Sequence, residues 1–199
     1  MNYCSSCGAA VVLQVPPGDN RERHVCQSCQ TIHYSNPKIV AGCILCWEER
    51  ILLCRRAIEP RYGYWTLPAG FMENGETTME AAAREALEEA HAQAEKMALY
   101  GIYNLKHISQ VYVMFRGELG QGYARAGDES LEVRLVTADE IPWPELAFPV
   151  VRETLERYLE ERSSGEFRVH NADVLRQADG QLIIQRHGGH TTAWPDISR

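Results

Sequence analysis

The sequence lacks several features that would each assign it to a class of protein. No uninterrupted apolar run reaches the roughly 18 residues that a transmembrane helix needs, so we expect no membrane partner. The N-terminal segment carries neither the basic region nor the long apolar core of a secretory signal peptide, which indicates a cytoplasmic protein. Internal repeats and low-complexity segments are also absent.

Positive charge is in short supply as well. The chain has 20 Lys and Arg against 27 Asp and Glu, a net charge of −7. A surface of this sign disfavours non-specific binding of nucleic acid, so we do not expect a nucleic-acid partner. The contents of hydrophobic residues (45%) and charged residues (24%) are ordinary for a soluble globular protein. A length of 199 residues accommodates one full domain and a small appendage.

Four of the seven cysteines form two C-x-x-C pairs. Cys4 pairs with Cys7 and Cys26 with Cys29, and eighteen residues separate the pairs. Two such turns can place four thiolates around one tetrahedral zinc ion, the alternative being four unrelated buried thiols. A segment of about 35 residues buries too little apolar surface to fold alone, so a metal would supply the missing stability. We therefore predict a structural zinc ribbon over residues 1–36.

The other three cysteines have a different setting. Cys43, Cys46 and Cys54 lie inside apolar runs, and on a strand positions 43 and 46 face opposite sides of the sheet. We interpret these three residues as small core hydrophobes.

The apolar pattern downstream of the ribbon predicts an α/β domain over residues 37–163. The expected strands cover residues 38–47, 50–56, 62–67, 94–103, 110–118 and 131–136. One helix begins after Gly75 and another covers residues 147–162. Residues 164–199 form a C-terminal extension, in which segments 167–175 and 181–187 around Asp179-Gly180 predict a hairpin. Beyond Gly188 we expect flexible, fraying chain.

The first helix combines an apolar face with a dense group of charges. Thr77 and Glu80 fit a capping box at its start. Helical spacing predicts an inner face formed by Met79, Ala82, Ala83, Ala86, Leu87 and Ala90. The same spacing places Arg84, Glu85, Glu88 and Glu89 on the other arc of the helix. Such a run is usually a solvated face, but like charges at this spacing also suit a divalent cation.

The segment Gly70–Ala92 resembles the Nudix box of the Nudix hydrolases. The similarity rests on Gly70, Glu76, Arg84-Glu85 and Glu88-Glu89 at their spacing, with GYWTLPAG leading into them. Together with the zinc ribbon, the chain resembles a subgroup of bacterial Nudix proteins and plant FAD or ADP-ribose pyrophosphatases. The resemblance implies the Nudix fold, a mixed β-sheet sandwiched between helices.

Three positions depart from the box. Ala86 and Ala92 replace bulky aliphatic residues, and His91 replaces the glycine at the helix end. Histidine is among the residues that tolerate a positive φ, so the helix can still end there. None of the three is an acidic position, so metal binding is not put in doubt.

The resemblance also implies a set of site residues. Glu85, Glu88 and Glu89 would bind Mg²⁺ or Mn²⁺, and the carbonyl of Ala69 would add a ligand. Glu76 would hold Arg84 in an ion pair that orients the ligands, and the loop that begins at Gly70 would let the glutamates converge. We therefore count Arg84 and Glu85 among the catalytic residues.

A further acid is expected on a loop outside the box, as a ligand or general base. The segment Asp128–Val133 precedes a strand, and in it Glu129 is our first choice and Glu132 our second. The alternative is that both are solvated loop acids.

The resemblance implies a small-molecule partner, a nucleoside diphosphate linked to a group X. We expect ADP-ribose or FAD, cleaved with release of AMP. Candidate substrate-binding residues are the cations and aromatic side chains Arg55, Arg56, Trp65 and Phe148, although for Trp65 packing in the core is slightly favoured. Ser109-Gln110 is followed by Val-Tyr-Val, not by the aromatic run of NADH pyrophosphatases, which disfavours NADH.

Other functions stay open. A Nudix domain can act as a non-catalytic nucleotide sensor, but sensors typically lose box glutamates that this chain retains. An NADH- or NAD-type pyrophosphatase and an enzyme for oxidised nucleoside triphosphates are further alternatives. The sequence leaves a homodimer open.

Overall fold

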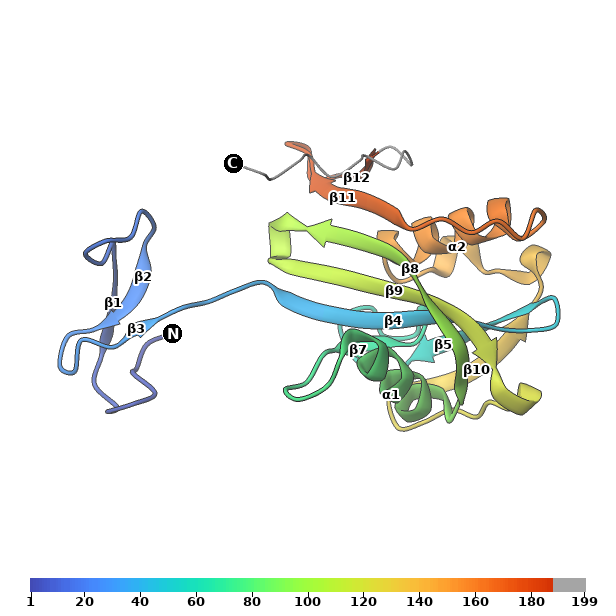
Figure 1. Ribbon diagram of the computed structural model, residues 1–199, viewed down its shortest axis with the longest axis horizontal. Coiled ribbons are helices and arrows are strands. Elements are labelled where there is room, and N and C mark those ends of the chain that lie inside the picture. Colours follow the sequence, from blue (N-terminus) through green and yellow to red (C-terminus); the bar gives the residue numbers. More distant parts are fainter. Residues whose placement is uncertain (188–199) are drawn as a thin grey trace, which may run out of the picture. The chain divides into compact units, whose positions relative to one another are not determined.

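A computed structural model of the chain describes residues 1–187, which belong to two compact units that divide after Pro37 (Figure 1). The N-terminal unit contains a three-stranded antiparallel sheet of β1 (Val11–Gln14), β2 (Arg23–Cys26) and β3 (Ile32–His33). The buried side chains of this unit are Cys4, Pro16, Val25 and Cys26. Two of the four are cysteines, so apolar packing alone gives this unit very little core.

Within residues 38–187, nine strands form one mixed sheet. They are β4 (Lys38–Trp47), β5 (Arg50–Arg56), β6 (Trp65–Thr66), β7 (Ala69–Phe71), β8 (Ala94–Leu105), β9 (Gln110–Leu119), β10 (Ser130–Val136), β11 (His170–Arg176) and β12 (Leu182–His187). The spatial order is β10-β5-β4-β9-β8-β11-β12, while β6 pairs with β5 and β7 pairs with β4. The pairs β4/β9 and β8/β11 are parallel, and the remaining pairs are antiparallel.

Two α helices of the described chain, α1 (Thr78–Ala90) and α2 (Pro149–Glu161), cover opposite faces of this sheet (Figure 1). One apolar cluster joins the alanines of α1 to β4, β5 and β9, and a second joins α2 to the other sheet face. In the connections up to residue 187 lie four short 3₁₀ helices: η1 (Lys106–Ile108), η2 (Gly120–Gly122), η3 (Ala138–Glu140) and η4 (Trp143–Glu145). The predicted architecture of a mixed sheet between helices is confirmed.

None of the helices in the described residues combines the length and the apolar character needed to cross a membrane.

Strand β4 explains the three downstream cysteines. It is apolar along most of its length and buried on both faces, as expected for a central strand in a covered sheet. Cys43 packs in the cluster beneath α1 together with Cys54 of β5, whereas Cys46 packs against the cluster beneath α2. The interpretation of these residues as small core hydrophobes on opposite sheet faces is confirmed.

The predicted ends of α1 are also confirmed. The Thr77 hydroxyl accepts a hydrogen bond from the Glu80 amide at 3.2 Å, and the Glu80 carboxylate accepts one from the Thr77 amide at 2.7 Å. His91 ends the helix with φ 45° and ψ 31°, in the left-handed region. The amide of His91 donates to the Leu87 carbonyl at 2.9 Å, the bond of an αL cap, and the amide of Ala92 donates to the Ala86 carbonyl at 3.1 Å.

The predicted inner face of α1 is partly wrong. Met79 and Leu87 are exposed, while Ala81 and Glu89 are buried. The buried stripe follows residues 81, 82, 86, 89 and 90, so the helix is rotated from the face that the apolar residues alone suggest. The small alanines of α1 permit close contact with β4. As a result of this contact, the carboxylate of Glu89 is buried.

Other boundaries differ from those expected. Of the strand expected over residues 62–67 only β6, at 65–66, forms, and β7, which follows Pro68, was not expected. The second helix begins at Pro149, not at residue 147. The predicted C-terminal hairpin is confirmed as β11 and β12, with β11 starting three residues later than expected. The fraying expected beyond Gly188 concerns residues outside the described part of the chain.

Candidate functional site

The four N-terminal cysteines lie together. Their sulfur atoms are all within 4.8 Å of one another, and the Cys4–Cys29 and Cys7–Cys26 Sγ pairs are 3.7 and 3.5 Å apart. Zinc–sulfur bonds of about 2.3 Å in a tetrahedron place sulfur atoms roughly 3.8 Å apart. The spacing of this cluster therefore fits a zinc ion, and four thiolates fill all four positions of a closed site.

Neighbouring groups bind the sulfurs and orient them. The amides of Ser6 and Cys29 donate to the sulfurs of Cys4 and Cys26, both at 3.4 Å. His33 Nε2 lies 3.3 Å from Cys4 Sγ, and the Thr31 hydroxyl lies 3.1 Å from Cys29 Sγ. Such surrounding bonds fix the direction of ligand lone pairs and offset thiolate charge.

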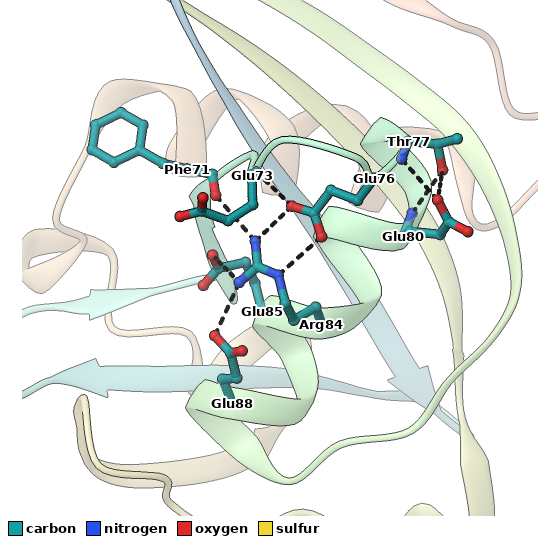
Figure 2. A network of polar contacts seen from close by, with 8 residues as sticks. All are labelled: Phe71, Glu73, Glu76, Thr77, Glu80, Arg84, Glu85 and Glu88. Atoms are coloured by element: carbon teal, nitrogen blue, oxygen red, sulfur yellow. Dashed lines mark hydrogen bonds and ion pairs between the residues drawn. The ribbon is translucent and has the colours of Figure 1, made fainter.

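In the second unit, Arg84 is the centre of an acidic network between the loop before α1 and the middle of that helix (Figure 2). Its guanidinium donates to both oxygens of Glu76, with distances of 3.0 and 2.8 Å from Nε and Nη2. Nη1 donates to Glu85 at 2.8 Å and Glu88 at 2.9 Å, and Nη2 donates to the Phe71 carbonyl at 3.1 Å. The predicted Glu76–Arg84 ion pair is present, and one cation ties the loop before α1 to two glutamates on it.

Glu76 is held as a carboxylate by this network. Hydrogen bonds from Arg84, and then from the amide of Glu73 at 2.6 Å, lower the pKa of Glu76 to about 2. The Glu76 carboxylate therefore ties the loop between β7 and α1 to Arg84 of the helix and to the backbone amide of Glu73.

Gly70 makes room for the close approach of Glu85. A Cβ atom at position 70 would lie 2.3 Å from the carboxylate of Glu85, far inside contact distance. The absence of a side chain thus lets the Glu85 carboxylate lie against the β7 backbone. Burial raises the pKa of Glu85 despite the hydrogen bond from Arg84.

Glu89 is the buried carboxylate of the site, with only 6% of its surface exposed. One oxygen accepts a hydrogen bond from the Ala69 amide at 3.2 Å. Loss of hydration raises the pKa of Glu89 to about 8, and the charges of Glu85 and Glu129 add to this effect. Arg56 acts in the opposite direction and is too weak to cancel the shift. A buried acid facing two further acids is an environment that a cation would stabilise.

The arrangement fits a divalent cation in its donor chemistry. Glu85, Glu88 and Glu89 offer carboxylate oxygens, the donors that Mg²⁺ and Mn²⁺ prefer. In the structure Arg84 neutralises Glu85 and Glu88, and in residues 1–187 only the four cysteines bring three or more ligand atoms within 4.8 Å. The backbone amide of Ala69 contacts Glu89. The carbonyl of Ala69, which was expected to add a metal ligand, is part of the same β7 backbone.

The loop before β10 is attached to the end of α1. The amides of Arg125 and Gly127 donate to the carbonyls of Ala90 and Glu89 at 2.8 and 2.9 Å, so the loop satisfies otherwise unpaired helix carbonyls. At Gly127 a Cβ atom would lie 1.8 Å from the Glu88 carbonyl oxygen, so only glycine permits this contact.

The two candidate loop acids, Glu129 and Glu132, lie in different places. Glu129 lines the same cavity as the glutamates of α1. Glu132 lies on β10 and pairs with Arg134 and Arg55 instead. The structure thus brings our first choice to the acidic cluster and does not bring the second.

A cavity of about 1020 Å³ adjoins the acidic cluster, and Arg84, Glu85, Glu88 and Glu89 all line it. Its volume lies at the upper end of the range for small-molecule sites, which is about 300–1,000 Å³. The cavity continues from the carboxylates to aromatic and aliphatic side chains on β9 and α2.

The four candidate substrate residues fall into two groups. Arg56 and Phe148 line the cavity, and the guanidinium of Arg56 lies over the Phe148 ring at 5.2 Å from its centroid. Arg55 donates to the Gly63 carbonyl at 2.9 Å and Trp65 is buried in the core beneath Arg134. Neither lines the cavity, so the structure does not bring Arg55 and Trp65 to the site.

Several cavity residues were not selected from the sequence. Glu73, Asp128 and Tyr112 line the cavity, as do Val174 and Leu182 of the C-terminal hairpin. The glycine before Asp128-Glu129 was a usable signal, since a glycine beside candidate acids often marks a close backbone approach. No local signal marks Val174 or Leu182, because their position depends on which strand β11 joins.

Comparison with known sequences gives a family-level match for both units. The family model for the NUDIX domain matches residues 36–158, and a model described as Nudix N-terminal matches residues 2–35. The first match alone covers more than half of the chain.

Individual relatives are consistent with this match. The NAD-capped RNA hydrolase NudC of Photobacterium profundum is 31% identical over 137 residues, which are 64% of this chain and 48% of that protein. The ADP-ribose pyrophosphatase of Methanocaldococcus jannaschii is 31% identical over 121 residues, which are 58% of this chain and 69% of that protein. This chain therefore spans about half the length of the NudC relative.

A solved structure is similar over most of the chain. The crystal structure of a NUDIX hydrolase from Nitrosomonas europaea is 52% identical and has a TM-score of 0.82, covering 87% of this chain and 99% of that one.

Proposed function

The chain belongs to the Nudix hydrolase family, and on this premise we propose that it cleaves the pyrophosphate bond of a nucleoside diphosphate linked to a second group, X. The observation that carries the proposal is the placement of an acidic cluster, with Glu89 buried, at the edge of a cavity large enough for a nucleotide. Carboxylates alone would repel such a substrate, so the cluster needs a cation to work.

We assign the catalytic cation, Mg²⁺ or Mn²⁺, to Glu85, Glu88 and Glu89, with the Ala69 carbonyl and Glu129 as further donors. When bound, such an ion neutralises the charge of the pyrophosphate and makes water a better nucleophile. Arg84 and Glu76 position the first two glutamates through their shared ion pairs. Glu129 is our candidate for the general base, because it reaches the cavity from a loop fixed to α1.

For the substrate we propose ADP-ribose or FAD, with AMP as one product. Arg56, itself 9% exposed, offers a positive charge near Glu89 for a phosphate, and Phe148 beneath it offers an aromatic face. The similarity to an ADP-ribose pyrophosphatase supports the first of these substrates.

An NAD-type substrate is the second candidate. It is favoured by the similarity to NudC, which is named for the hydrolysis of NAD-capped RNA. Gln110 and Tyr112 line the cavity at the position where the sequence departs from the aromatic run of NADH pyrophosphatases. The net charge of −7 remains our reason for not expecting an RNA partner.

A substrate panel tests the proposal. Purified protein is assayed with ADP-ribose, FAD, NADH, NAD and an NAD-capped RNA, each with Mg²⁺, with Mn²⁺ and with chelator. We expect metal-dependent release of AMP, fastest from ADP-ribose or FAD. Turnover of none of the five substrates with either metal would contradict the proposed function, and a preference for NAD or its RNA conjugate would establish the alternative.

For the N-terminal unit we propose a structural Zn²⁺ held by Cys4, Cys7, Cys26 and Cys29. The sulfur–sulfur distances and the match to the Nudix N-terminal family support this assignment. Metal analysis of protein purified without added metal should give about one zinc per chain.

A further inference from the structure

The C-terminal hairpin of β11 and β12 lies outside the residues matched by the NUDIX domain, which end at 158, yet it contributes to the substrate cavity. Val174 of β11 and Leu182 of β12 both line this cavity. We propose that the hairpin is a specificity element of the site and that Leu182 packs against the face of a heteroaromatic ring of the substrate. This inference rests on the proposed function and adds to it a recognition role for the C-terminal extension.

The hairpin is fixed to the sheet by β11. Residues His170 to Asp173 pair in parallel with residues Gly101 to Asn104 of β8. The Asn104 side-chain nitrogen, Nδ2, also donates to the Asp173 carboxylate at 2.9 Å. Val174, the next residue along β11, is fully buried in the cluster beneath α2. The strand therefore extends the central sheet and is not a loosely attached tail.

Strand β12 is fixed by a buried carboxylate on α2. Glu153 is 2% exposed and accepts two hydrogen bonds from Arg186, at 2.7 and 2.8 Å. Arg157 lies 3.4 Å from the same carboxylate. Removing the partner of a buried charge is costly, so Glu153 holds Arg186, and with it β12, close to α2. An element held from two sides can act as a wall of a binding site.

The register of the hairpin determines which side chains face the cavity. Val174 lies opposite Ile184, and Arg176 lies opposite Leu182. Because side chains alternate along a strand, Leu182, Ile184 and Arg186 share the face that contacts α2. Ile183 points to the other face and does not line the cavity. Leu182 and Ile183 are nonetheless equally exposed, at 40% and 39%.

The chemistry of this wall favours a ring over a sugar. The aliphatic residues that line the cavity around the hairpin, α2 and the end of β8 are Leu105, Ile108, Val150, Val151, Val174 and Leu182. A ribose placed against them would leave its hydroxyls without hydrogen-bond partners, which is costly in a buried site. The face of a flat heteroaromatic ring has no hydrogen-bonding groups that would be left without partners. Polar groups for the edge of the ring are available in the same cavity from His107, Gln110 and Tyr112.

The test compares Leu182→Asp with the matched control Ile183→Asp. The probes are AMP and FMN, the two halves of FAD, together with ribose 5-phosphate, which has no ring. Binding is measured by titration calorimetry without divalent metal, so the readout does not require turnover. Thermal unfolding of both variants checks that the hairpin remains attached.

We expect Leu182→Asp to weaken binding of AMP, FMN or both by about ten-fold, because one apolar contact is lost and a charge is added. Ribose 5-phosphate binding should not change, and Ile183→Asp should bind all probes as the wild type does. A lower affinity for AMP would show that the adenine ring packs against Leu182. A lower affinity for FMN would show that the ring of group X packs there. Leu182→Met should restore the wild-type affinity.

Three results would overturn the inference: unchanged binding of both rings in Leu182→Asp, an equal loss in Ile183→Asp, or wild-type protein that binds neither AMP nor FMN. Failure of the proposed function is separate, because it would appear as absent turnover in the substrate panel while these binding differences persist.

Discussion

Each of the two units contains a cluster of acidic side chains: four cysteines in the first and the glutamates of α1 in the second. The two clusters differ in how they depend on the hydrophobic core. In residues 1–37 two of the four buried side chains are themselves cysteines of the cluster. In residues 38–187 apolar clusters on both sheet faces supply the core, and the glutamates of α1 lie at the border of that core. The cysteine cluster takes the place of a hydrophobic core in the first unit. The glutamate cluster is held in position by the hydrophobic core of the second unit.

This difference teaches what a metal does in each place. Four converging thiolates would repel one another without an ion. In the first unit the free energy of metal binding therefore contributes directly to the free energy of folding. In the second unit, Arg84 neutralises Glu85 and Glu88, and burial favours the protonated form of Glu89. The site can therefore keep its shape without a metal, and in our proposal the metal adds reactivity.

The largest effect should follow from loss of the zinc site. Cys26→Ser removes one of four ligands at a fully buried position, and structural zinc contributes on the order of 10 kcal/mol to small folds of this kind. We expect the N-terminal unit to unfold in this variant. The measurements are zinc content and amide hydrogen exchange resolved over residues 1–37.

The matched control is Cys54→Ser, which changes the same residue type in the sheet unit. Cys54 lies in the core cluster beneath α1, so its replacement should leave the zinc content unchanged. A Cys26→Ser protein that retains one zinc and native protection in residues 1–37 would refute the ribbon. Turnover per folded sheet unit should fall far less than stability does.

The next largest effect should follow from Glu89→Gln, and here the fold should survive. Glutamine retains an oxygen that can accept the bond from the Ala69 amide, and it is uncharged like the protonated form of Glu89 that burial favours. It cannot replace a carboxylate as a metal ligand. We expect metal-dependent AMP release to fall more than about 100-fold, because even outer partners of metal ligands contribute 10–100-fold. Circular dichroism should be unchanged.

Glu132→Gln is the control for this variant, since Glu132 lies on β10 and pairs with arginines away from the cavity. Its activity should remain close to wild type. Full activity of Glu89→Gln under the same conditions would remove Glu89 from the ligand set and, with it, our reading of the acidic cluster.

Much of this comparison could be predicted from the sequence, because both clusters depend on local spacing. The two C-x-x-C pairs predict one metal site, and Thr77, Glu80 and His91 predict both ends of α1. Strands and turns were predictable to within a few residues because their apolar runs are bounded by proline and glycine.

The remainder depends on long-range packing, which local patterns do not report. Glu89 was expected on the outer arc of α1 and is buried, because the alanines next to it set how the helix rotates onto β4. Trp65 and Arg55 looked suitable for a substrate and instead pack into the core or bind the Gly63 carbonyl. The place of Leu182 in the cavity depends on β11 joining β8, which no spacing in the sequence indicates.

A third prediction tests how the fold positions Glu129. In Gly127→Ala the new methyl group would meet the Glu88 carbonyl oxygen, so the loop must move away from α1. We expect a loss of about 1–3 kcal/mol in stability, as for an overpacked site. Activity should fall as well, since Asp128 and Glu129 move with the loop.

Gly180→Ala provides the contrast, because Gly180 has φ +86° with open space around its Cβ position. It should lower stability slightly, through backbone strain alone, and leave kcat unchanged. If Gly127→Ala retains wild-type kcat, Glu129 does not act from this loop, whatever the change in stability.

The smallest effect should follow from Thr77→Ala, which removes the capping box of α1 without touching a carboxylate of the cluster. Loss of an N-cap costs about 1 kcal/mol, which corresponds to roughly 2–4 °C in Tm for a domain of this size. Thr137 forms the same box with Glu140, but at a three-residue 3₁₀ helix, so Thr137→Ala should cost less. The zinc content should be wild type in both. A Tm loss in Thr77→Ala together with unchanged zinc would show that the two units draw on separate sources of stability, whereas zinc lost in step with the cap would show that they unfold as one.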